Sequence, residues 1–222
     1  MSALLALFAR EARLAFAGGG GPAGPAAYFL AALTLAPLAI GPSGGTLTAA
    51  GPGVIAFAAL LAVLQGAERL HGEDVSDGTL DLYALSGLAL PMVAFAKTLG
   101  VGFATLWPLP LIGFLGAVSY GLPIPSALFF AGALACAIPG LAFIASFAGA
   151  LAAGVKRAGL LIALIAAPLM IPLLVFAAAT GREAYAGDER ALANLLLTAS
   201  ASLFVMALSP FAIGAALKAR LE

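Results

Sequence analysis

The sequence predicts an all-α polytopic membrane protein with six transmembrane helices, and its charge distribution is the strongest of the observations that lead there. All twenty Lys, Arg, Asp and Glu residues lie at the termini or in three short clusters, which leaves charge-free tracts at residues 14–67, 98–155, 158–181 and 191–217. At about 20 residues per span, the first two tracts hold two helices each and the others one each. The composition agrees, because 63% apolar and 9% charged residues, with a mean hydropathy of +1.12, differ widely from soluble domains, in which roughly 25% of residues are charged.

Glycine and proline clusters divide the two longer tracts, since such clusters usually mark turns. One cluster lies at residues 41–45 and another at residues 120–125. The predicted spans are residues 26–40, 52–67, 92–118, 127–153, 158–180 and 191–217. Prolines within spans three to five remove backbone donors, and each is as consistent with a functional kink as with a passive bend. These prolines are Pro108, Pro110, Pro139, Pro168 and Pro172.

Six spans place both termini on the same side of the membrane, and the basic residues indicate which side this is. Only Arg182 and Arg190 fall between spans five and six, whereas the eight other basic residues lie on the side of the termini. Because short cytoplasmic loops are rich in Lys and Arg, we expect both termini in the cytoplasm. Arg10 and Arg13 follow the first apolar stretch instead of preceding it, which does not fit a cleaved signal peptide.

Residues 1–17 show the pattern of a helix that lies in the membrane interface. The apolar residues between Leu4 and Phe16 spread over one broad arc, with Arg10 and Arg13 opposite. Glu11 falls inside the apolar arc, where an unpaired carboxylate is costly. We therefore expect Glu11 to have a basic or hydrogen-bonding partner on another segment.

The spans offer almost no residues for catalysis or metal binding. Lys97 is their one ionisable candidate, about one and a half turns into the third helix, and we expect its side chain to snorkel to the headgroups. The single histidine, His71, is expected to be a solvated loop residue, with pH sensing left open. A structural or catalytic metal site needs three or four ligands, and Cys136 fits a small buried apolar residue. We expect no catalytic residue, no metal site and no cofactor bound directly by this chain.

Residues 68–90 are the most informative segment between spans. They contain half of the ten acidic residues, followed by the apolar residues Leu80, Leu82, Tyr83 and Leu85. Ser76 or Asp77 could cap the start of a short helix. A short, acidic, cytoplasmic helix between spans two and three suits docking to a soluble partner, and a solvated loop that rests on the membrane explains the composition equally well.

Within this segment the sequence resembles a known family. The motifs Glu68-Arg69-Leu70, Glu73-Asp74 and Asp77-Gly78-Thr79-Leu80, followed by Ala96-Lys97, resemble the haem exporter protein B family (CcmB). Further matches lie at residues 28–30, 34–38, 40–42, 52–55, 58–61, 154–161, 168–174 and 208–212, so the resemblance covers nearly the whole chain. This chain departs from the family at residues 100–102, which read Gly-Val-Gly where a His-Trp pair is common, and at Ser86-Gly87, where Ser-Pro is common.

The resemblance implies an ABC-2-type permease subunit of system I cytochrome c maturation in the bacterial inner membrane. It implies a separate cytoplasmic ATPase (CcmA-like), membrane haem-handling subunits (CcmC-like and CcmD-like), an indirect link to a periplasmic haem chaperone, and two copies of this chain per complex. Haem would be transported or bound by a partner, and ATP would bind the partner, which agrees with the lack of a Walker-type glycine loop in the sequence. The residues implied in ATPase coupling are Glu73, Asp74, Asp77, Gly78, Thr79, Leu80, Asp81 and Tyr83. Apart from the resemblance, we expect structural or interface contacts from Glu11, Arg13 and Lys97.

Two alternatives remain open at the level of the sequence. The chain could anchor the ATPase without haem passing through it, because an anchor and a haem conduit use the same docking helix. It could also act as an autonomous small-molecule carrier, although the scarcity of ionisable groups in the spans argues against ion coupling.

Overall fold

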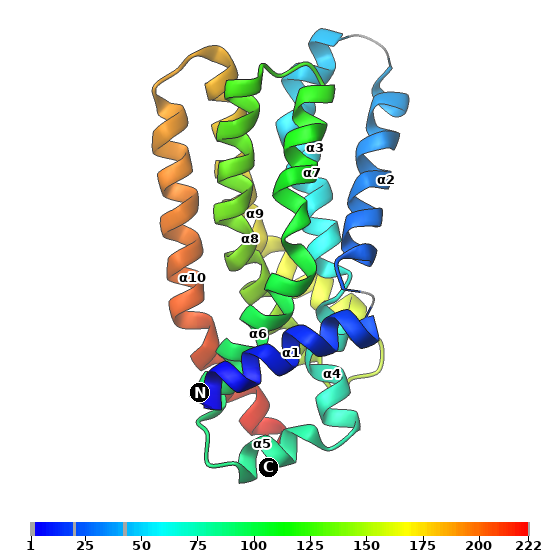
Figure 1. The fold of residues 1–222 in the computed structure, drawn as a ribbon, viewed down its shortest axis with the longest axis vertical. Helices are drawn as coiled ribbons and strands as arrows, with labels where there is room; N and C mark the ends of the chain where they lie inside the picture. Colours follow the sequence, from blue (N-terminus) through cyan, green and yellow to red (C-terminus); the bar gives the residue numbers. More distant parts are fainter. Residues whose placement is uncertain (1–2, 20, 42–43, 222) are drawn as a thin grey trace.

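The computed structural model describes residues 3–19, 21–41 and 44–221, and within them it contains helices and no strand. Met1 and Ser2 of the predicted interfacial segment, and Pro42 and Ser43 of the first predicted turn, lie outside the described residues. The helices of this described part (Figure 1) are α1 (Ala3–Gly19), α2 (Ala23–Ile40), α3 (Gly44–Leu64), α4 (Ala67–Ser76), α5 (Thr79–Leu85), α6 (Leu90–Leu106), α7 (Pro108–Ser119), α8 (Ile124–Ala152), α9 (Ala158–Ala186) and α10 (Arg190–Leu221).

Six segments of this described chain are long and apolar enough to cross a membrane, which confirms the predicted fold class. They are Ala23–Ile40, Gly45–Ser76, Leu90–Ser119, Ile124–Ala152, Ala158–Ala186 and Arg190–Leu221. The long helices run side by side along the vertical axis of Figure 1, and α1 lies across them at one end. The short helices α4 and α5 and both chain ends lie at this same end, whereas the α7–α8 and α9–α10 connections lie at the opposite end. We call the end with α1, α4 and α5 the α5 end.

The centre of the bundle is α8, which packs against α9 and α10. Its side chains Phe130, Leu134 and Leu141 have no exposed surface. Gly140 permits a close approach of α10, because a Cβ there would lie 2.9 Å from Ser202 Cα, and its N–H donates a 2.8 Å hydrogen bond to Ser202 Oγ. Small residues at such crossings allow backbones to pack closely in membranes. Large apolar side chains remain exposed on the outer helices, for example Phe211, which is 67% exposed and suits contact with lipid.

Two features of the helices differ from the sequence-based boundaries. The second long helix begins at Gly44 and contains Pro52, whereas the sequence suggested a start at residue 52. The third long helix is interrupted at Trp107, between α6 and α7. Pro108 and Pro110 remove two backbone donors within a single turn, which explains a break at this place. The prolines within α8 and α9 are accommodated inside continuous helices.

Candidate functional site

The α5 end owes its shape to a sharp turn between α4 and α5. Gly78 adopts a left-handed conformation with φ of 78°, which glycine tolerates at little cost. Asp77 Oδ1 accepts a 2.9 Å hydrogen bond from the Thr79 N–H, and this bond lowers the pKa of the Asp77 carboxyl below its ordinary value. The turn sends α5 beyond the end of the bundle (Figure 1).

Helix α5 has one face against the protein and one face open to its surroundings. Leu80 and Tyr83 are buried, whereas Leu82 and Leu85 are 66% and 83% exposed. Asp81 is also exposed. The open face therefore combines two leucines with a carboxylate, and we call Asp81, Leu82 and Leu85 the α5 outer face.

The residues that the sequence singled out for partner contact fall into two groups. Glu73, Asp77 and Asp81 are exposed, and Gly78 and Thr79 are partly buried. Asp74, Leu80 and Tyr83 are buried, so their side chains contact this chain itself and are not available to a partner in this conformation.

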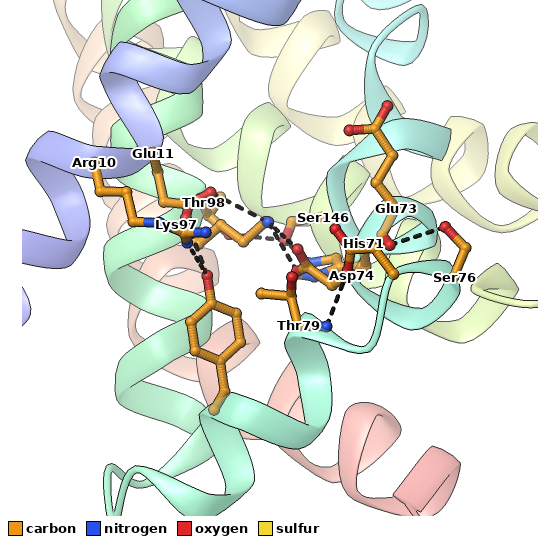
Figure 2. A network of polar contacts seen from close by, with 12 residues as sticks. Arg10, Glu11, His71, Glu73, Asp74, Ser76, Thr79, Lys97, Thr98 and Ser146 are labelled. Carbon is orange, nitrogen blue, oxygen red and sulfur yellow. Dashed lines mark hydrogen bonds and ion pairs between the residues drawn. The ribbon is translucent and has the colours of Figure 1, made fainter.

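Charged side chains from three helices meet next to the buried face of α5 (Figure 2). Lys97 Nζ lies 2.8 Å from an Asp74 oxygen and 3.2 Å from Glu11 Oε2. Glu11 Oε1 lies 2.7 Å from Arg10 Nη1 and accepts a 3.0 Å hydrogen bond from the Tyr83 hydroxyl. We call these five residues, from α1, α4, α5 and α6, the polar cluster.

The polar cluster confirms one expectation and overturns another. Glu11 does find basic and hydrogen-bonding partners on other helices, Lys97 and Tyr83. The expectation that Lys97 snorkels is wrong, because its side chain is only 8% exposed and points to two carboxylates. Two nearby carboxylates compensate for the desolvation of the buried Lys97 ammonium group. A buried lysine without such partners would be strongly unfavourable.

Tyr83 is held in the cluster as a hydrogen-bond donor. Burial raises the pKa of the Tyr83 phenol, and the negative charge of Glu11 raises it further. The Tyr83 hydroxyl also accepts a 2.7 Å hydrogen bond from Arg10 Nη1. The phenol therefore stays protonated at neutral pH and joins α5 to α1.

The single histidine is also buried, contrary to the expectation of a solvated loop residue. His71 is 1% exposed, and its Nε2 lies 2.8 Å from Ser146 Oγ, which lies 2.7 Å from Thr98 Oγ1. Helix α4 packs this closely because Gly149 of α8 has no side chain: a Cβ there would collide with the carbonyl oxygen of Ala67. The segment that looked like a loop is thus a helix docked on the bundle.

Helix α1 approaches α6 at Gly100. A Cβ on Gly100 would lie 2.8 Å from the Phe8 carbonyl oxygen and 3.2 Å from Glu11 Cβ. The missing side chain lets Glu11 reach Lys97. Arg13 lies on the exposed side of α1, where its Nε donates to the Ala9 carbonyl at 3.2 Å, and it does not join the polar cluster.

A cavity of about 540 Å³ opens beside the polar cluster, between α1, α4, α6 and α8. Its charged lining includes Arg10, Glu11, Asp74 and Lys97 of the polar cluster, and Thr105 of α6 also lines it. Within residues 3–19, 21–41 and 44–221, no group of three or more His, Cys, Asp and Glu residues could hold a metal ion. Cys136 is partly buried on α8, less than the sequence suggested.

The fold and this site define a six-span helical membrane protein with a short helix pair and a buried ion cluster at one end. The family model described as CcmB protein matches residues 2–220, and the chain belongs to the CcmB family, as its resemblance indicated. It is 37% identical over 217 residues to heme exporter protein B of Paracoccus denitrificans, which covers 98% of this chain and 99% of that relative. The protein of the same name from Escherichia coli K12 is 36% identical over 220 residues, 97% of this chain and 98% of that relative.

Proposed function

We propose that this chain is a membrane component of a haem export system in the bacterial inner membrane. Its family and the name of its relatives, heme exporter protein B, support this role over nearly the full length of the chain. Six candidate membrane spans support the location. The excess of basic residues on the side of the termini supports an orientation with both termini in the cytoplasm.

More specifically, the chain serves as the permease subunit onto which a cytoplasmic ABC ATPase docks. The observation that carries this proposal is the α5 outer face, where Leu82 and Leu85 are 66% and 83% exposed next to the carboxylate of Asp81. Exposed leucines at the end of a bundle, beside a carboxylate, favour burial in a protein interface. Glu73 and Asp77 are exposed nearby on α4 and at its end, and they extend the surface with negative charge that suits a basic partner.

In this proposal the chain itself catalyses no reaction. ATP binds and is hydrolysed on the partner, and CcmC-like and CcmD-like subunits handle haem on its way to a periplasmic chaperone. Two copies of this chain complete the transporter, because an ABC transporter combines two membrane halves and one six-span chain supplies one half.

Charge reversal on the α5 outer face tests the docking. We expect Asp81→Lys combined with Leu82→Lys to weaken capture of the ATPase about 30-fold, the loss typical of an interface hot spot. Glu189→Lys is the matched control, because Glu189 is an exposed carboxylate at the opposite end of the bundle. Undiminished capture and ATP turnover by the α5 variant would refute the docking proposal.

Two alternative functions make different predictions in vesicles. If the chain only anchors the ATPase, the haem-loaded chaperone is released without haem flux through the membrane. If the chain is an autonomous carrier, the purified protein transports a substrate without any partner. The sequence argument against ion coupling no longer holds, because Glu11, Asp74 and Lys97 are buried ionisable groups. The cavity of about 540 Å³ beside them is the observation that favours the carrier function.

A further inference from the structure

The buried face of α5 contacts two different parts of the molecule. Leu80 packs in an apolar cluster with Ala94, Phe143 and Ile213 of the bundle. Tyr83 packs with Leu7 of α1 and with Val93 and Ala96 of α6. Tyr83 therefore joins α5 to α1 as well as to the bundle.

Glu11 is the central link of the polar cluster, because its two oxygens face two different helices. Oε1 accepts the hydrogen bond from Tyr83 of α5, and Oε2 pairs with Lys97 of α6. Lys97 then pairs with Asp74 of α4. The contacts run without a gap from α5 through α1 and α6 to α4, and Figure 2 shows Glu11, Lys97 and Asp74 converging.

The electrostatics of the cluster oppose independent movement of these helices. The two cations, Arg10 and Lys97, balance the two carboxylates, Glu11 and Asp74. Glu11, Asp74 and Lys97 are all buried. Separating a single helix from the others leaves a charge buried without its partner, which is strongly unfavourable. Arg10, whose side chain is 48% exposed, remains available to Glu11 when the contact with Lys97 opens.

Four residues of the polar cluster also belong to the wall of the 540 Å³ cavity: Arg10, Glu11, Asp74 and Lys97. Helix α1 contributes Arg10, Glu11 and Leu14 to the lining of the cavity. A shift of α1 therefore changes the shape of this part of the wall.

We propose that Tyr83, Glu11 and Lys97 are positioning residues that couple the docking helix α5 to the cavity, so that a partner that engages α5 moves α1 and changes access to the cavity. The identity of that partner rests on the proposed function, whereas the link between α5, α1 and the cavity is a property of this chain alone. The two parts can therefore fail separately.

The isolated protein tests the link first. In a Cys136→Ala background, a single cysteine replaces Thr105, which lines the cavity, and its rate of reaction with a membrane-impermeant maleimide reports access. We expect Tyr83→Phe and Glu11→Gln each to raise this rate about fivefold or more, a change in the usual range of coupling between sites. The double variant reacts no faster than the faster single variant, because both substitutions break the same chain of contacts.

Matched controls make the same chemical changes at the opposite end of the bundle. Tyr120→Phe removes a buried hydroxyl that donates to the Leu33 carbonyl at 2.6 Å, and Glu183→Gln alters a carboxylate that accepts a hydrogen bond from Asn194. Both controls should leave the rate at residue 105 unchanged. If Tyr83→Phe and Glu11→Gln lower only the melting temperature and match the controls in labelling rate, the cluster is merely structural and the proposal is refuted.

Addition of the ATPase and ATP tests the coupling in the complex. We expect nucleotide to change the labelling rate of the otherwise unaltered chain, and we expect Tyr83→Phe to abolish that response while it still captures the ATPase through the α5 outer face. A full response in the Tyr83→Phe complex would contradict the proposal. Failure of capture by the unaltered chain would refute ATPase docking instead, and the result on the isolated protein would stand.

Discussion

Replacement of Lys97 by methionine measures how much the polar cluster stabilises this protein. Methionine fills a similar volume without charge, so the substitution removes the ammonium group that pairs with Asp74 at 2.8 Å and with Glu11 at 3.2 Å. Glu11 keeps Arg10 and Tyr83 as partners, whereas Asp74 loses the ion pair that neutralises it. Removal of one partner of a buried pair costs about 3–5 kcal/mol, which for a chain of this size lowers the melting temperature by about 10 °C.

Thermal unfolding in detergent, followed by near-ultraviolet circular dichroism, is a suitable assay. The double variant Lys97→Met with Asp74→Asn should be more stable than the sum of the single effects by about 0.5–3 kcal/mol, since it leaves no unpaired charge between these positions. Arg190→Met is the control, because Arg190 forms an exposed ion pair with Asp188 and should alter the melting temperature little. A Lys97→Met protein with the same melting temperature as the unaltered chain would refute the account of the cluster as a paired, dehydrated site.

Three further predictions concern other parts of the structure. Gly100→Ala places a Cβ 2.8 Å from the Phe8 carbonyl oxygen and should destabilise the protein by about 1–3 kcal/mol, with faster proteolysis in α1; equal melting temperature and equal proteolysis would contradict the close packing. His71→Ala removes the partner of Ser146 and leaves a cavity. It should lower the free energy of unfolding by about 2 kcal/mol, measured by thermal unfolding, and an unchanged stability would show that His71 does not anchor α4. Hydrogen bonds from Arg190 hold the pKa of Asp188 at about 2, below its ordinary value of 3.8. Because this ion pair is exposed, its contribution to stability is small; it is present above pH 3.8 and is lost as the pH falls toward 2. An NMR titration of Asp188 with a midpoint at its ordinary value would contradict this.

The fold could be predicted from the sequence because membrane spans depend on composition over long windows. Charge-free tracts and glycine-proline clusters were sufficient to predict six spans, and the apolar arc of residues 1–17 indicated a separate helix at one end. The second long helix begins earlier than the sequence predicts, because it accommodates Pro52 within its length. Local residue preferences do not reveal which prolines a helix tolerates.

The polar cluster could be predicted only in part. The position of Glu11 in an apolar arc indicated a missing partner, but the identity of that partner depends on the packing of α1 across α6. The burial of Lys97 and His71 was missed because each was judged from its neighbours in sequence, while the groups that compensate for burial come from other helices. Gly100 and Gly149 carried the relevant signal, since glycines within helices often mark close crossings.

Site-specific photocrosslinking from the α5 outer face is the most direct test of the proposed docking function. A photoreactive amino acid at Leu85, which is 83% exposed, should form a covalent link to the ATP-binding subunit in membranes that contain the assembled complex. The same group at Leu192, an exposed residue near the start of α10, should not crosslink that subunit. A crosslink to the ATPase from Leu192, with none from Leu85, would contradict the assignment of α5 as the docking helix.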